Sequence, residues 1–391
     1  MTFKIIDFEQ NASIKVVGVG GAGGNAINRM VASGMHGVEF IAVNTDGQDL
    51  EVSSADACIC IGESITRGLG AGAKPEIGRQ AMEEDRDKVA ERLADTDLVF
   101  ITAGMGGGTG TGAAPVIAQI ARELGALTVG VVTEPFHFEG LPRMRNALAG
   151  IADLQDHVDT LIVIKNQRLL SICSRDTTLE DAFAKADEVL LQATRGIADL
   201  ITIPGLINLD FNDVKTVITE GGDAIIGVGH HKGENRAAEA AKKAIHSPLL
   251  EEISIDGAKG ALINITAGSN LTLFEANEAA SIIQEAAGQE ANIIFGTVVD
   301  ESLVDEMRVT VIATGFYLNK EGRLENSLAK VEQRRERLGE RLVVEQKGAG
   351  VAARPTRAPE SPAVEAEPEP IGGRRADLDY PAILRRQKKT A

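Results

Sequence analysis

The residues in this 391-residue chain that most clearly suggest chemistry are glycines gathered in three clusters. The clusters span residues 18–24, 68–72 and 104–112 and hold 14 of the 42 glycines. Two of them stand where a predicted strand ends and a predicted helix begins, so backbone N–H groups and the positive helix end would face one point, as around bound phosphate. One such loop is also compatible with a simple tight turn, but three together favour a site for several anionic groups.

The first cluster alone permits another interpretation. Gly18-x-Gly20-x-x-Gly23 matches the dinucleotide fingerprint, and Asp46 follows the next predicted strand, where such folds place a ribose-binding acid. A nicotinamide-dependent oxidoreductase is therefore an alternative, although it leaves the other two clusters unexplained. The usual P-loop nucleotidase is excluded because G-x-x-x-x-G-K-[ST] does not occur. A nucleotide-binding scaffold without hydrolytic activity is the second alternative, and in each case we expect backbone groups and threonine hydroxyls to hold phosphate.

A second set of polar residues lies far along the chain from every glycine cluster. Asn208, Asp210 and Asp213 occur in the segment NLDFNDVK, and the two aspartates, three apart at a predicted helix start, would share one helix face. Helix capping accounts for this pattern. Catalysis also accounts for it, because two carboxylates brought transiently to a phosphate chain can orient an attacking water and help hold Mg²⁺.

The elements that must position these residues alternate between strands and helices. Strands are predicted over 14–20, 38–45, 98–104, 127–133 and 158–166, with helices from 25, over 76–93 and after 112. Strands that are apolar on both faces and joined by crossover helices indicate a Rossmann-like α/β domain with a parallel sheet. A long periodic segment over 178–203 predicts a connecting helix that starts with Thr178 and Asp181 as a capping box.

Beyond that helix the chain divides into three further parts. Residues 204–317 contain four strand-like runs and two helical patterns, over 236–244 and 276–287, which predict a second α/β domain after the first domain of residues 1–177. Residues 318–375 are proline-rich and charged, which indicates a flexible linker, although its stretch 321–346 is compatible with a transient helix. Apolar residues return in 376–391, where we expect a partner-binding peptide.

Composition excludes several classes of protein. The formal net charge of −17 and an aromatic content of 3% argue against nucleic-acid binding. The N-terminus lacks a signal-peptide pattern, and no stretch is apolar enough to insert into a membrane, so we expect a cytoplasmic protein. Cys58 and Cys60 alternate in a strand-like pattern and are predicted to be buried thiols, and no metal-ligating motif is present.

The third cluster resembles a known family. The run GGGTGTG over residues 106–112 is similar to the signature loop of the tubulin/FtsZ GTPases, and GVGGAGGNAINRM, VNTD, TRGLGAGAKPEIG, EPFHFEGLPR and NLDFNDVK match that family in order. The resemblance implies a GTP-binding domain, a long central helix and a second domain that contributes to catalysis. It also implies that GTP or GDP with associated Mg²⁺ is the ligand, that the chain polymerises head-to-tail, and that it acts in a ring at the bacterial division site, at midcell beneath the inner membrane.

The resemblance also assigns roles to individual residues. Phosphate contacts fall to the three glycine loops, and ribose and phosphate contacts to a Glu/Arg pair. Guanine contacts fall to a pocket in which an aromatic ring stacks and a carboxylate accepts from guanine N1 and N2, while Asp46 and Thr133 are assigned to GTP binding without a more specific role. These residues are Gly21, Ala22, Gly23, Gly24, Asn25, Asp46, Ala71, Gly72, Gly108, Thr109, Gly110, Thr133, Glu139, Arg143, Asn166, Phe183 and Asp187. Without the family, Glu139 and Arg143 would be an ordinary surface ion pair and Phe183 a core residue.

Two further implications concern contacts between molecules. In the family, the loop that corresponds to Asn208, Asp210 and Asp213 enters the nucleotide site of the next subunit, so the complete GTPase would exist only at a subunit contact. The C-terminal peptide resembles a segment that binds membrane-tethering and regulatory proteins, through Tyr380, Pro381, Ile383, Leu384, Arg385 and Arg386. Tyr380, Ile383 and Lys74 depart from the residues that are common in the family, which leaves partner preference and phosphate affinity open.

Overall fold

The computed structural model describes residues 12–318, apart from 175, 220–221, 248–249 and 251–254, and also residues 324–326. The predicted linker beyond residue 326 and the C-terminal peptide, including Tyr380 to Arg386, lie outside the described residues.

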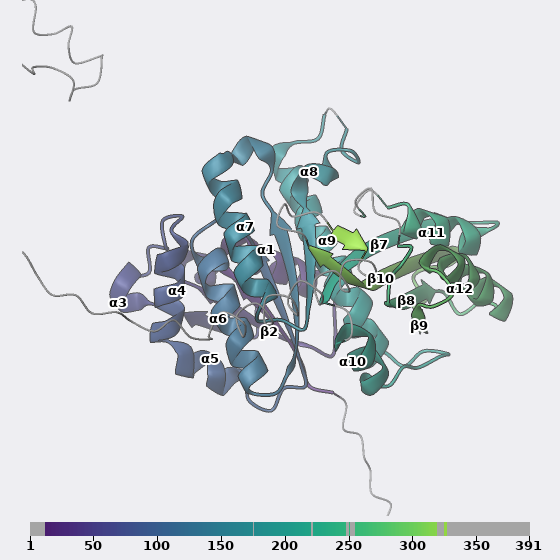
Figure 1. The fold of residues 1–391 in the computed structure, drawn as a ribbon, viewed down its shortest axis with the longest axis horizontal. Helices are drawn as coiled ribbons and strands as arrows, with labels where there is room; N and C mark the ends of the chain where they lie inside the picture. Colours follow the sequence, from purple (N-terminus) through teal and green to yellow (C-terminus); the bar gives the residue numbers. More distant parts are fainter. Residues whose placement is uncertain are drawn as a thin grey trace, which may run out of the picture. The chain divides into compact units, whose positions relative to one another are not determined.

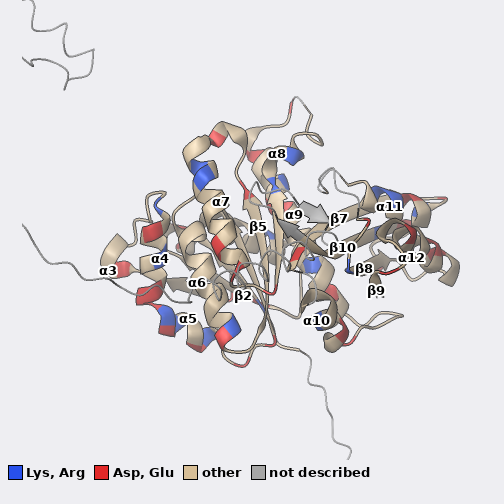
Figure 2. Cartoon of the chain, in the orientation of Figure 1, with Lys and Arg blue, Asp and Glu red and all other residues tan. Residues whose placement is uncertain are grey.

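One sheet of 11 strands runs through the described chain, in the order β3-β2-β1-β4-β5-β6-β7-β10-β8-β9, with β11 paired to β10. Figure 1 shows the β2 end of this sheet and the β8 and β9 end on opposite sides of the fold. The strands from β1 to β7 pair in parallel, whereas β10 is antiparallel to its neighbours. Few charged residues lie on the strands (Figure 2), as expected for a sheet covered on both faces. The strand bounds are β1 (Ile14–Val19), β2 (Glu39–Asn44), β3 (Ala57–Cys60), β4 (Leu98–Gly104), β5 (Leu127–Glu134), β6 (Thr160–Lys165), β7 (Gly222–Lys232), β8 (Gly260–Ala267), β9 (Asn292–Val299), β10 (Glu306–Leu318) and β11 (Leu324–Asn326).

Helices cover both faces of the sheet. Buried side chains of α1, α9 and α10 form one core against it, those of α4 to α7 form a second core, and α11 and α12 pack on the strands of the C-terminal part. The helix bounds are α1 (Gly20–Ala32), α2 (Gly47–Glu51), α3 (Glu63–Thr66), α4 (Pro75–Glu84), α5 (Arg86–Leu93), α6 (Thr109–Glu123), the 3₁₀ turn η1 (His137–Glu139), α7 (Leu141–Gln155), α8 (Asn166–Leu169), α9 (Leu179–Thr202), α10 (Phe211–Thr219), α11 (Arg236–Ile245) and α12 (Leu273–Ala287). The predicted α/β class with a parallel sheet is confirmed.

The long helix α9 connects the segment around α8 with the segment before α10. Its N-cap Thr178 accepts a hydrogen bond from the Asp181 N–H at 3.1 Å, which confirms the predicted helix start. Its 24 residues, at about 1.5 Å per residue, span about 36 Å. The helix runs from the neighbourhood of α8 to that of α10 (Figure 1).

The structure differs from the predicted elements in several places. The single helix predicted over 76–93 is interrupted at Asp85, whose carboxylate accepts a hydrogen bond from the Gly62 N–H at 2.7 Å and pairs with Lys88. Cys58 is exposed and Cys60 only half-buried, so the prediction of buried thiols is wrong; β3 is an edge strand with a neighbour on one side only. Residues 324–326, predicted as linker, form a strand.

The two predicted α/β regions share the sheet, because β7 pairs with β6 at residues 160–162 and 222–224. In the part of the chain that the structure describes, no helix is long and apolar enough to cross a bilayer.

Candidate functional site

The turn from β1 into α1 presents backbone donors that no side chain caps. The helix begins at Gly20, which has φ +71°, and its N-cap Val19 has no side-chain oxygen to bind the first N–H groups. Gly23 is required by packing, since a methyl group there would lie 2.6 Å from the Thr102 carbonyl oxygen. The N–H groups of Gly20, Gly21 and Ala22 in the first turn of α1 therefore have no capping side chain and lie at the positive end of the helix dipole, and Gly23, Gly24 and Asn25 follow in the next turn.

A second donor set comes from the turn between β4 and α6. Gly106 has φ +104°, and its N–H donates to the Thr111 hydroxyl at 2.8 Å, which fixes the loop over the helix start. Gly108 is the N-cap of α6 and, like Val19, offers no side-chain cap. This turn touches the first one: a methyl group at Gly20 would lie 3.0 Å from the Gly110 nitrogen.

The second glycine loop, over residues 68–72, contacts the third loop. Its glycines at 68, 70 and 72 all have positive φ, and the Gly70 N–H donates to the Thr45 carbonyl at 3.1 Å. Thr45 in turn is linked by its hydroxyl to the Thr109 hydroxyl at 2.6 Å. Ala71 abuts Gly108, where an added methyl group would lie 2.7 Å from the Ala71 Cβ. The structure thus brings the three predicted loops together at the carboxyl end of the parallel strands.

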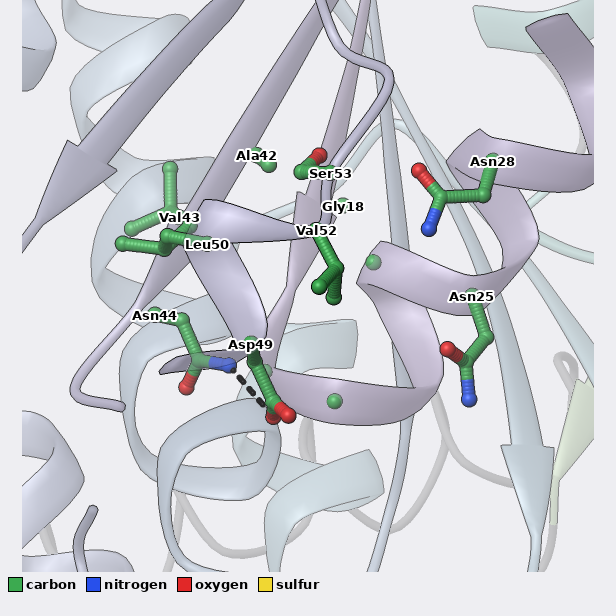
Figure 3. Close-up of a pocket in the computed structure, with 13 residues that line it drawn as sticks. Gly18, Asn25, Asn28, Ala42, Val43, Asn44, Asp49, Leu50, Val52 and Ser53 are labelled. Atoms are coloured by element: carbon green, nitrogen blue, oxygen red, sulfur yellow. Dashed lines mark hydrogen bonds between the residues drawn. The ribbon is translucent and has the colours of Figure 1, made fainter. Parts of the chain in front are cut away.

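Acidic and amide side chains line one flank of this group. Asp46 caps α2, accepting from the Gln48 N–H at 3.0 Å, and Asp49 accepts a hydrogen bond from Asn44 Nδ2 at 3.1 Å (Figure 3). Between Asn44, Asp49 and the start of α1 lies a cavity of about 30 Å³. That volume suits a water molecule and not a nucleotide, so a nucleotide would have to lie across the open surface of the loops.

The predicted ribose residues lie beside the third loop. Glu139 and Arg143 form an ion pair of 3.0 Å, and the Glu139 carboxylate also accepts from the Phe136 N–H at 2.8 Å. Arg143 packs on Gly106, where an added methyl group would lie 2.7 Å from the Arg143 Cγ. Thr133 is buried at the end of β5, next to the same loop.

The predicted base pocket combines three chemical groups. Phe183 on α9 is 39% exposed, and its ring meets that of Phe136 edge to face at 5.5 Å. Asn166 starts α8, is buried, and its Oδ1 has no hydrogen-bond partner among the described residues. Asp187 lies one turn along α9 from Phe183, and burial raises its pKa to about 6, against the opposing effect of Arg29. An aromatic face, an unused amide oxygen and a half-buried carboxylate can together receive a purine that carries donors.

The predicted catalytic residues lie elsewhere. Asn208, Asp210 and Asp213 are exposed and stand between the end of α9 and the first turn of α10, across the length of α9 from the base pocket. Asp210 Oδ1 accepts from the Asp213 N–H at 2.8 Å, and Asn208 Oδ1 accepts from the Gly205 N–H. The capping interpretation thus holds for Asp210, whereas no hydrogen bond from the side chain of Asp213 occurs within the described part of the chain.

Sequence reasoning missed three residues of the site. Thr45 links the second and third loops, Asp49 lies against Gly21, and Phe136 stacks at 5.1 Å on Phe138 and meets the ring of Phe183. Thr45 and Phe136 fall within VNTD and EPFHFEGLPR, two of the motifs that carry the family resemblance, so their position was the available signal. Nothing in the sequence signals Asp49.

Two family models match long stretches of this chain. Residues 13–174 match the model of the Tubulin/FtsZ family GTPase domain, and residues 222–317 match that of the FtsZ family C-terminal domain. An FtsZ dimer from M. jannaschii, solved empty, is 46% identical with a TM-score of 0.77, over 81% of this chain and 93% of that one. A tryptophan-to-tyrosine mutant of FtsZ from the same organism matches with the same identity and score, over 82% of this chain and 96% of that one.

A more distant relative shares the fold. CetZ2 from Haloferax volcanii, solved as a GTPγS-bound protofilament, is 22% identical with a TM-score of 0.68, over 85% of this chain and 99% of that one. Neither family model supports the nicotinamide-dependent alternative. The two family models and the identity to FtsZ over most of both chains show that the chain belongs to the FtsZ family of tubulin-like, filament-forming GTPases.

Proposed function

We propose that the chain binds GTP across its three glycine loops and hydrolyses it only where two subunits meet head to tail. The observation that carries this proposal is a distance within one chain. The helix α9, about 36 Å long, separates the glycine loops from Asp210 and Asp213. No side-chain motion covers such a distance, so the carboxylates of one subunit can act on the nucleotide of another. A head-to-tail contact of this kind repeats into an open filament.

Exposed apolar side chains support two contact surfaces. One group lies around the glycine loops and the other on the loop before α10, the start of α12 and the turn before β10. The first comprises Val52, Leu69, Phe138 and Leu141, and the second Leu206, Leu273, Phe274 and Val304, each more than 60% exposed. Where such exposed apolar residues form a contiguous patch, that patch is typical of a surface that another protein covers.

In the proposed mechanism each group has a defined task. The N–H groups at the starts of α1 and α6 and the Thr109 hydroxyl bind the phosphates, while Phe183, Asp187 and Asn166 bind guanine. Asp210 and Asp213 of the next subunit orient the attacking water and accept its proton.

The oxygen ligands at the proposed site, which are nucleotide phosphates and two carboxylates, suit Mg²⁺ bound together with the nucleotide. In the described residues no group of three or more His, Cys, Asp or Glu side chains is placed to hold a metal, and Mg²⁺ is commonly bound by phosphates, waters and one or two carboxylates. Asp210 and Asp213 would supply those carboxylates, and the ion would neutralise charge that develops on the phosphate oxygens.

The test is the rate of phosphate release per subunit as a function of protein concentration, with light scattering recorded alongside. A shared site predicts that the rate per subunit rises with concentration together with scattering, and Asp213→Ala should keep GTP binding within about twofold and lower turnover at least about 100-fold. A rate independent of concentration would contradict the shared site. Scattering without phosphate release would indicate a scaffold that does not hydrolyse GTP.

We further propose that the filament forms the ring at the bacterial division site and that residues 376–391 bind a membrane-tethering protein. Four basic and no acidic side chains occur over 380–391, so an acidic adaptor fits this peptide. Deletion of residues 376–391 should leave GTPase activity and assembly unchanged and abolish adaptor binding in a pull-down. Unchanged adaptor affinity would contradict the role of the peptide.

A further inference from the structure

A lysine at the junction of the second and third loops has no assigned role. Lys74 is exposed and forms no ion pair or side-chain hydrogen bond within the described part of the chain, and its backbone is held in place. Its N–H donates to the Ala71 carbonyl at 3.2 Å, and its own carbonyl accepts from the Ile77 N–H at 3.1 Å. Its backbone also abuts the third loop, since a methyl group at Gly108 would lie 3.0 Å from the Lys74 nitrogen.

The contacts of the site define an order from the base pocket to this lysine. The ring of Phe183 contacts the ring of Phe136, and the Phe136 N–H donates to the Glu139 carboxylate. Glu139 pairs with Arg143, which packs on Gly106 at the start of the third loop. The third loop continues to Gly108, which the backbone of Lys74 contacts. A nucleotide with its base at Phe183 and its phosphates along the third loop would therefore extend its terminal phosphate toward Lys74.

A lysine at position 74 is unfavourable for the stability of helix α4. It occupies the N-cap of α4, where no side-chain hydrogen bond caps the helix. Asn, Asp, Ser and Thr stabilise that position, and a cation at a helix N-terminus is opposed by the helix dipole. Across the three loops, over 18–25, 67–74 and 104–112, the cationic residues are Arg67 and Lys74 alone. Arg143 packs on the third loop from outside and is paired with Glu139.

We propose that the Lys74 ammonium contacts the terminal phosphate of a nucleoside triphosphate and makes the site prefer GTP over GDP. This inference rests on the proposed GTP site and adds the residue that distinguishes the two nucleotides. GTP carries one more anionic phosphate than GDP, and a lysine ammonium is a compact donor for such a group. A hydrogen bond to a charged group corresponds to about tenfold or more in affinity, which should appear for the triphosphate alone.

The experiment compares GTPγS and GDP binding by calorimetry to the full chain, at concentrations below assembly. Lys74→Asn should raise the Kd of GTPγS about tenfold or more and that of GDP by less than about twofold, while Lys74→Arg keeps most of the preference. Lys74→Asn should also raise the melting temperature of the nucleotide-free protein by about 1–3 °C, since it supplies a cap. A structural role would instead lower it.

Arg67→Gln is the matched control. It removes one positive charge from the same loop at a residue whose N–H is bonded to the Glu63 carbonyl at 2.9 Å, and it should change both Kd values by the same small factor. Equal losses for GTPγS and GDP in Lys74→Asn, or no loss for either, would overturn the inference. If the unsubstituted protein bound neither nucleotide, the proposed function would fail, and the inference with it.

Discussion

Asp187 should make the affinity for GTP depend on pH. Burial raises the pKa of its carboxyl from 3.8 to about 6 in the nucleotide-free protein, and the positive charge of Arg29 opposes that rise only in part. Guanine offers donors at N1 and N2, so the ionised carboxylate is the form that binds it. Because the pKa is raised, the folded protein keeps the proton below about pH 6, and affinity should be full above that pH and fall as pH decreases through it.

The size of the effect follows from the ionised fraction. With a pKa of about 6, the carboxyl is about 90% ionised at pH 7 and about 10% ionised at pH 5, so Asp187 alone should weaken GTP binding nearly tenfold over that range. The nucleotide phosphates also take up protons there. The relevant quantity is therefore the difference between the protein and Asp187→Asn, in which this contribution is absent.

Asp187→Asn also predicts a change in base preference. Loss of a charged acceptor that serves two donors should cost about 2 kcal/mol or more at pH 7, or about 30-fold in the Kd of GTP. The new amide N–H₂ can donate to the second carbonyl of xanthine, so the xanthosine nucleotide should gain affinity relative to GTP. Competition titrations at pH 5, 6, 7 and 8 measure both effects. The same pH slope in both proteins, or equal losses for the two nucleotides, would refute the role of Asp187.

Two further predictions concern stability. The hydrogen-bonded ion pair with the buried Arg236 lowers the pKa of the Glu275 carboxyl to about 2. Glu275→Gln should therefore lower the free energy of unfolding by about 2–3 kcal/mol at pH 7 and reduce the loss of stability between pH 4.5 and 2. Denaturant titrations of the variant that show the same pH dependence as the parent would contradict this. Gly112→Ala would push a methyl group into the Pro75 carbonyl and should cost about 1–3 kcal/mol in the same assay, whereas Gly24→Ala, with nothing within 4 Å, should cost nothing; equal effects would be the contrary result.

Much of the fold could be predicted because its strands and helices leave local patterns. Apolar runs on both sides of short helices identified most of the strands from β1 to β6. The start of α12 was predicted three residues late, since Leu273 and Phe274 are 82% and 88% exposed and interrupt the apolar periodicity. The true start signal is the capping box of Thr272 and Glu275. The pairing of β6 with β7 joins residues about 60 positions apart, and long-range pairing leaves no local pattern.

The site was predictable in its parts and not in its assembly. The glycine loops are visible in sequence because positive φ and close packing select glycine. The hydroxyl contact between Thr45 and Thr109 and the approach of Lys74 to Gly108 depend on tertiary packing alone. The exposure of Cys58 likewise depends on β3 being an edge strand, which its alternating pattern does not reveal.

The central claim is that one GTPase site is built from two chains, and mixing two defective variants tests it most directly. Asp213→Ala keeps the loops and the base pocket, whereas Asp187→Ala keeps Asp210 and Asp213 and loses guanine binding. Each alone should release phosphate slowly, with circular dichroism showing that both are folded. An equal mixture should regain turnover, because GTP on the first variant meets Asp213 of the second. A mixture whose rate is only the mean of the two separate rates would contradict the account.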